Sequence, residues 1–208
     1  MTEKDKQTEE KIFEAATEVF EEKGMDGARM QDIADRAGIN KALLHYYYRT
    51  KDHLFETVFQ LLAGKMLRKF APVFEKDLTL EEKIRFFFQQ HITFMQENPR
   101  LPSFVLNEIN RNPDRIKKLL KNVDFKKLWM KIEEQHKDEL EKYNITIDNI
   151  PQIMSTIAAI SVFPFAARGI LEGIFENLGV EFDTYIEERK GFAADFVIGA
   201  LQSRKASK

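Results

Sequence analysis

Residues 30–49 read MQDIADRAGINKALLHYYYR, and the spacing of apolar and small residues here is typical of two short helices joined by a tight turn. Ala34 is small enough to let the two helices cross closely. The apolar contacts that hold them together are expected from Ile33, Ala37, Ile39 and Leu44. The stretch therefore predicts a helix-turn-helix unit.

Two residues mark the turn and the start of the second helix. Gly38 stands where a residue beyond a helix end often takes the left-handed conformation, which only glycine adopts at little cost. Asn40 follows as a natural N-cap, because its side-chain oxygen accepts a hydrogen bond from a backbone N–H of the next turn. We expect the second helix to cover residues 41–48.

The composition is typical of a globular helical protein. Of the 208 residues, 43% are hydrophobic and 32% are charged, and 18 are Phe. This length and balance predict a substantial apolar core. The absence of cysteine excludes disulfides and thiolate metal sites and fits a reducing, cytoplasmic location. Residues 1–11 are charged and lack the apolar segment of a secretory signal.

Apolar spacing, caps and prolines predict the remaining helices. The first helix covers residues 8–23 and ends at Gly24, and Thr50 caps a later helix that Pro72 bends or ends. Thr79 opens another helix with a capping box. This helix is expected to end at residue 98, and further helices are expected to cover residues 101–111, 112–143, 148–178 and 183–203. The chain is thus expected to be all-α, with about nine helices and no strands.

The longest apolar run covers residues 153–167. It is shorter than the roughly 20 residues that span a bilayer, and it contains Pro164. We therefore expect a buried helix and no membrane partner.

The charges are distributed unevenly, although the net charge is only -2. Residues 8–24 carry six Glu and two Lys, whereas residues 29–51 carry five Lys or Arg against two Asp. The positive charge therefore lies on the predicted helix-turn-helix, as a polyanion partner requires. Ordinary surface charge is the alternative explanation.

Four segments together resemble the amino-terminal domain of TetR-family transcriptional regulators. They are residues 12–24, residues 33–39, the aromatic run Tyr46-Tyr47-Tyr48 and residues 51–54, about a quarter of the chain. The resemblance implies a three-helix DNA-binding domain over residues 1–52 and a helical domain for effector binding and dimerisation over residues 53–208.

The start of the second helix is expected to read base edges in the major groove of duplex DNA. Lys41 is the candidate for a hydrogen bond to guanine, and Ala42 and Leu43 are candidates for contact with a thymine methyl group. His45 and Tyr46 lie one turn further along, within reach of a base edge or a phosphate.

The resemblance implies further contacts with the DNA backbone. Tyr47 and Lys51 match positions that commonly hold phosphates, and Arg29 and Gln31 stand where the family grips the backbone. Spacing alone equally allows Tyr47 to point inward. Two departures from the family pattern stand out: Arg29 replaces a frequent Ser or Thr cap, and His45 replaces a frequent Tyr.

Aromatic residues are concentrated in the predicted second domain. They suit an apolar pocket for a small molecule, but residues at helical spacing also suit an ordinary core. Arg168 is a candidate contact for an anionic ligand, or it pairs with Glu172. The candidate pocket residues are Phe87, His91, Phe94, Phe104, Trp129, Phe163 and Arg168.

The last two predicted helices are expected to form a homodimer. Small residues along residues 148–178 allow another helix to come close, and with residues 183–203 they suit an intersubunit four-helix bundle. A dimer also fits the predicted helix-turn-helix, because two recognition helices related by a twofold axis read a palindromic operator.

These features predict a ligand-responsive repressor that a small apolar or amphipathic effector releases from DNA. No catalytic residue, metal site or cofactor is expected, because neither His53 with Glu56 nor His136 with Glu139 has a third ligand at an informative spacing. The alternative is a helical adaptor or membrane-surface protein that does not read DNA.

Overall fold

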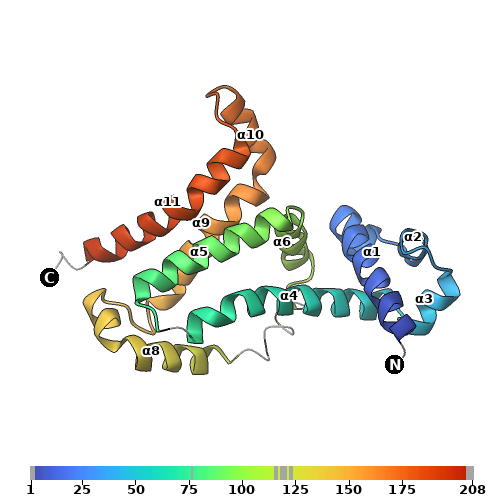
Figure 1. The fold of residues 1–208 in the computed structure, drawn as a ribbon, viewed down its shortest axis with the longest axis horizontal. Coiled ribbons are helices and arrows are strands. Elements are labelled where there is room, and N and C mark those ends of the chain that lie inside the picture. Colours follow the sequence, from blue (N-terminus) through green and yellow to red (C-terminus); the bar gives the residue numbers. More distant parts are fainter. Residues whose placement is uncertain (1–2, 76, 115–116, 118–120, 122–123, 205–208) are drawn as a thin grey trace. The chain divides into compact units, whose positions relative to one another are not determined.

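The computed structural model describes residues 3–75, 77–114, 117, 121 and 124–204. Within these residues every regular element is a helix, as the sequence predicts, and ten helices are present against the nine expected. The contacts divide the chain into two units (Figure 1). The first contains Met1–Lys65 and Ser103–Leu120, and the second contains Met66–Pro102 and Lys121–Lys208.

The first unit contains α1 (Glu3–Gly27), α2 (Met30–Arg36) and α3 (Lys41–Tyr47), with the first part of α4 (Lys51–Glu75) and most of α6 (Leu101–Arg111). Apolar side chains from these helices meet in one core, where the rings of Phe20 and Phe55 pack edge to face with their centroids 5.1 Å apart. Phe104 of α6 joins this core against Phe55. Other fully buried members are Ile12, Val19, Ile33, Leu44 and Val58.

Helix α1 is longer than the sequence predicts. It begins at Glu3 and continues to Gly27, whereas the expected end was Gly24. Gly24 interrupts the helical geometry at φ 67° and ψ 174°, and the chain then makes one more turn, in which the Ala28 N–H donates to the Gly24 carbonyl at 3.2 Å. Glycine tolerates this kink because it has no Cβ.

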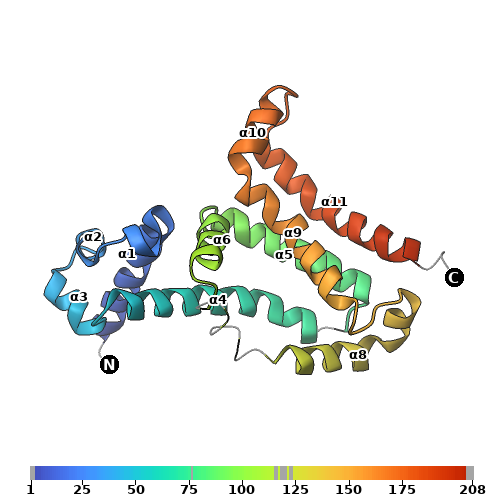
Figure 2. The same cartoon turned by 180° about the vertical axis from the view of Figure 1, so that it is seen from behind.

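The second unit contains α5 (Leu80–Glu97), α8 (Phe125–Lys142), α9 (Ile150–Ala166), α10 (Arg168–Glu176) and α11 (Phe182–Ser203). Helices α5 and α11 lie side by side, as Figures 1 and 2 show from opposite sides. Their facing surfaces supply much of the core of this unit. Its buried members include Phe88, Ile92, Ile186, Ala193, Val197 and Ile198.

The predicted single helix over residues 112–143 is wrong. Helix α8 begins only at Phe125, after Asp124, whose carboxylate accepts a hydrogen bond from the Lys127 N–H at 2.9 Å. Aspartate favours this capping position because it satisfies a backbone donor that the helix leaves unpaired. Helix α8 is also kinked at His136.

The predicted single helix over residues 148–178 is also wrong. The chain leaves helical geometry at Ala167, and α9 and α10 are bent by 68° relative to each other. Pro164 contributes to this break, because proline has no N–H to donate to the carbonyl four residues earlier. That carbonyl, on Ile160, instead accepts hydrogen bonds from Nε and Nη2 of Arg189 in α11, at 3.2 and 3.0 Å.

The apolar run in α9 is not buried as predicted, because Phe163 is 58% exposed and Met154 is also exposed. An apolar composition alone does not show whether a helix is buried in the core or lies on the surface of the chain. Among the described helices, none is by itself long and apolar enough to cross a membrane, and only the bent pair α9 and α10 meets that test together.

Candidate nucleic-acid interface

The turn between α2 and α3 follows from local hydrogen bonds around Gly38. Gly38 has φ 67°, and its N–H donates to the Asp35 carbonyl at 3.2 Å. The next N–H, on Ile39, donates to the Ala34 carbonyl at 3.0 Å. This pair of bonds is the Schellman arrangement that ends a helix at a left-handed residue. The predicted role of Gly38 is confirmed.

Helix α3 presents one face outward and one face to the core. Asn40 caps the helix as predicted, since its side chain accepts a hydrogen bond from the Leu43 N–H at 2.7 Å. Leu44 is fully buried, whereas Tyr46 is 79% exposed. The other predicted base-reading residues, Lys41, Ala42, Leu43 and His45, are exposed as well. The structure therefore brings the predicted reading residues together on the outer surface of one capped helix.

The start of α2 has no side-chain cap at Arg29, and an acidic residue in its first turn, Asp32, makes hydrogen bonds there instead. Arg29 is extended and makes no side-chain capping bond, in line with its replacement of the usual Ser or Thr. Asp32 accepts a hydrogen bond from the Lys23 ammonium at 2.6 Å, and this bond, with further help from Arg29, lowers the pKa of the Asp32 carboxyl. Gln31 donates to Asp35 at 2.7 Å. Arg29 and Gln31 thus both lie at the exposed start of α2.

Lys51 links α4 to the end of α1. Its ammonium donates to the backbone carbonyls of Ala28 at 3.0 Å and Asp26 at 3.3 Å. An ammonium has three N–H donors, so one more remains for a phosphate. The predicted phosphate contact by Lys51 is therefore compatible with this structural role.

Tyr47 makes a contact that the sequence analysis missed. Its hydroxyl donates to Oδ1 of Asp5, in the first turns of α1, at 3.1 Å. The Tyr47 side chain is half-buried, so it neither joins the core nor lies fully in solvent. Asp5 carries no motif that would signal this contact, because 42 positions separate the two residues and only the folding of α1 onto α3 brings them together.

Comparison with known proteins supports this reading of the first unit. The family model described as "Bacterial regulatory proteins, tetR family" matches residues 12–58. The chain is 33% identical over 73 residues to the HTH-type transcriptional regulator PksA of Bacillus subtilis, covering 35% of this chain and 36% of that protein. It is 26% identical over 114 residues to the biofilm operon icaADBC negative transcriptional regulator IcaR of Staphylococcus epidermidis, covering 51% of this chain and 62% of that protein.

The fold of both units has counterparts among solved structures. A TetR transcription regulator from Haloarcula marismortui superimposes with a TM-score of 0.63 at 20% identity, covering 94% of this chain and 98% of that one. Over residues 12–58, the chain is similar to the tetR family of bacterial regulatory proteins. The matched part of the chain spans about a third to three fifths of the length of these curated relatives, 36% and 60% for two of them. Those relatives are named as transcriptional regulators rather than enzymes, in agreement with the sequence analysis.

The predicted effector-binding residues lie at several different places in the structure. Phe87 and His91 stack in α5 with ring centroids 5.1 Å apart, and burial lowers the pKa of His91 to about 4. Phe94 and Trp129 are buried in α5 and α8, whereas Phe163 is exposed on α9. Phe104 belongs to the core of the first unit.

Arg168 is the one predicted effector residue that lines a described cavity. This cavity, of about 340 Å³, is also lined by Gln96, Phe165, Phe182 and Glu187. The Arg168 guanidinium pairs with Glu172 at 2.7 Å, as the sequence allowed, and lies 4.5 Å from the centroid of the Phe182 ring. The cavity is thus lined by both apolar and charged groups.

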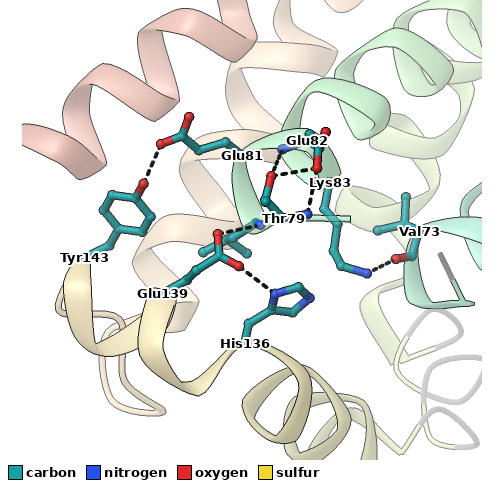
Figure 3. A network of polar contacts seen from close by, with 9 residues as sticks. Val73, Thr79, Glu81, Glu82, Lys83, His136, Glu139 and Tyr143 are labelled. Carbon is teal, nitrogen blue, oxygen red and sulfur yellow. Dashed lines mark hydrogen bonds and ion pairs between the residues drawn. The ribbon is translucent and has the colours of Figure 1, made fainter. Parts of the chain in front are cut away.

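A polar network in the second unit explains the His136 and Glu139 pair (Figure 3). One oxygen of the Glu139 carboxylate contacts His136 Nδ1 at 2.9 Å, and the other accepts from the Leu80 N–H at 2.8 Å. Tyr143 donates to Glu81 nearby, and the predicted Thr79 capping box is present. The pair therefore fastens α8 to the start of α5. Among the described residues, no group of His, Asp and Glu is arranged to hold a metal ion.

Proposed function

We propose that the protein is a sequence-specific transcriptional repressor that binds a palindromic DNA operator as a homodimer. The observation that carries this proposal is the geometry of α3, whose capped N-terminus presents Lys41, Ala42 and Leu43 to solvent while Leu44 anchors the opposite face in the core. A helix exposed in this way fits into the major groove with its first residues against base edges.

Separate residues are proposed to position the protein and to read the sequence. Lys41 hydrogen-bonds to guanine, Ala42 and Leu43 contact thymine methyl groups, and His45 and Tyr46 reach base edges or phosphates. The backbone contacts come from four residues around this helix, where charge and N–H donors bind phosphate oxygens without selecting bases. These residues are Arg29, Gln31, Tyr47 and Lys51.

Exposed apolar side chains on α10, on the turn after it and on α11 support the homodimer. Ile170 is 69% exposed, Leu178 is 68% exposed and Phe192 is 63% exposed. Phe196 stacks on Phe192 at 6.2 Å between ring centroids and is exposed too. Large exposed apolar groups often mark a protein interface, so a second copy of the chain is the proposed cover. A twofold dimer then accounts for a palindromic operator.

Repression and release by an effector complete the proposal. A relative named as a negative regulator supports repression, and the cavity beside Arg168 supports binding of a small apolar or amphipathic molecule. Binding of that molecule shifts the helices of the second unit, so that the two recognition helices no longer match the half-site spacing. A cytoplasmic location follows from a DNA target.

Selection of random duplex DNA by the purified protein, at two salt concentrations, tests the proposal. Enrichment of a palindromic motif is expected, with affinity that falls as salt rises. Light scattering of the protein with and without the selected duplex gives the number of chains in each state, and two per palindrome are expected. Absence of enrichment, with apolar probes still bound to the exposed apolar side chains, contradicts the proposal and favours the helical adaptor.

A further inference from the structure

The Tyr47 hydroxyl, one of the proposed phosphate-binding groups, has a single hydrogen-bond donor, and an acid already occupies it. It donates to Oδ1 of Asp5 at 3.1 Å. Asp5 lies in the first turns of α1, and Tyr47 is the last residue of α3. The contact therefore joins the N-terminal end of α1 to the C-terminal end of the proposed recognition helix.

The donor inventory of tyrosine decides what this contact means for DNA. A phenol has a single O–H, and a phosphate oxygen only accepts hydrogen bonds. While Tyr47 donates to Asp5, it has no second proton to offer to a phosphate. A phosphate placed against the same hydroxyl would also lie close to the Asp5 carboxylate, and two anions at that distance repel each other.

We infer that Asp5 is an intramolecular competitor of the DNA phosphate, which holds the Tyr47 hydroxyl in the free protein and must release it when DNA binds. This inference rests on the proposed function. Asp5 thereby lowers the affinity for DNA of any sequence, and the first turns of α1 must move away from Tyr47 on the duplex.

The protonation of Tyr47 is consistent with this exchange. Partial burial, followed by the hydrogen bond with Asp5 and the negative charge of Asp5, raises the pKa of the Tyr47 phenol above its ordinary value of 10.0. The hydroxyl therefore keeps its proton at neutral pH and remains a donor for whichever anion lies against it.

The test compares Asp5→Ala with Glu3→Ala, a matched control that removes a second carboxylate from the same first turn of α1. Each substitution is made in the wild-type chain and in a Tyr47→Phe chain, and thermal unfolding checks that the four variants and the two parent chains are folded. Affinity is measured for the selected duplex and for a scrambled duplex of the same length.

We expect Asp5→Ala to tighten binding to both duplexes about two- to fivefold more than Glu3→Ala does. In the Tyr47→Phe background the two substitutions are expected to act alike. Equal effects in the wild-type chain, weaker binding by Asp5→Ala, or an advantage of Asp5→Ala that persists without the Tyr47 hydroxyl would each overturn the inference.

A measurement without DNA separates this inference from the proposed function. Tyrosine absorbance is titrated with pH in the wild-type, Asp5→Ala and Tyr47→Phe chains, and Asp5→Ala is expected to lower the pH at which Tyr47 ionises. An unchanged titration overturns the Asp5 contact even if the protein binds DNA. A wild-type chain that binds no duplex refutes the proposed function, and the competition with phosphate is then overturned with it.

Discussion

Replacing Arg189 tests the account of the break between α9 and α10. The Arg189 guanidinium supplies two donors to the Ile160 carbonyl, at 3.2 and 3.0 Å, because Pro164 has no N–H for it. Arg189→Met keeps an apolar stem of similar length and removes both donors. The Ile160 carbonyl then loses its partner within a partly buried segment.

The expected cost follows from the chemistry of an unsatisfied acceptor. Leaving a buried carbonyl without its partner costs about 1–3 kcal/mol, and the part-buried setting here favours about 1–2 kcal/mol. In a Pro164→Ala chain, the new N–H at position 164 lies four residues after Ile160 and donates to the same carbonyl. Arg189→Met is therefore expected to cost less than about 0.5 kcal/mol in that background.

Urea unfolding followed by helical circular dichroism gives the free energy of unfolding for the four chains of this cycle. The contact of Arg189 with the Tyr185 ring, 5.5 Å from the ring centroid, is lost in both backgrounds and so cancels in the comparison. An equal loss of stability in the presence and absence of Pro164 would refute the reasoning, since Arg189 would then stabilise the fold by some means other than the orphaned carbonyl.

Three further outcomes are expected. Lys41→Ala should relax discrimination at one base pair by about 1–3 kcal/mol, whereas Lys51→Ala should weaken binding to all sequences alike and flatten its salt dependence; identical effects of the two on matched and scrambled duplexes would contradict the division of roles. Gly38→Ala should lower the free energy of unfolding by about 1–2 kcal/mol, because alanine is strained at φ 67°, and a calorimetric midpoint equal to wild type would speak against this. Burial lowers the pKa of His91 in the folded chain from 6.5 to about 4, so the unfolded chain binds the proton more readily. The free energy of unfolding should therefore fall by about 3 kcal/mol as the pH drops from 6.5 to 4. In His91→Phe that part of the pH dependence should be absent.

Local signals in the sequence were sufficient for the helix-turn-helix. The left-handed turn at Gly38, the cap at Asn40 and the capping box at Thr79 each depend on atoms within a few residues of one another. The spacing of apolar residues likewise placed Leu44 in the core and left Tyr46 outside it. Such features can be predicted from the sequence because the backbone needs the same caps and glycines wherever a helix ends.

The long helices of the second unit were harder to predict, because two of the helices expected from the sequence are interrupted. Asp124 and Pro164 were both visible in the sequence, but apolar periodicity continued past each of them. Whether a helix continues through such a residue depends on the partners that its unpaired groups find in space. For Pro164 the partner is Arg189, which lies on another helix.

The sequence by itself determined that the chain is helical, that residues 30–48 form a helix-turn-helix and that this unit is similar to the TetR family, because these properties arise from local spacing and local hydrogen bonds. Only the tertiary structure decided that Asp5 holds the Tyr47 hydroxyl, that Lys51 binds the end of α1 and that Phe163 lies in solvent. Each of these depends on which distant segment lies against the residue. That choice is made by packing of the whole chain, and no pattern within a single helix encodes it.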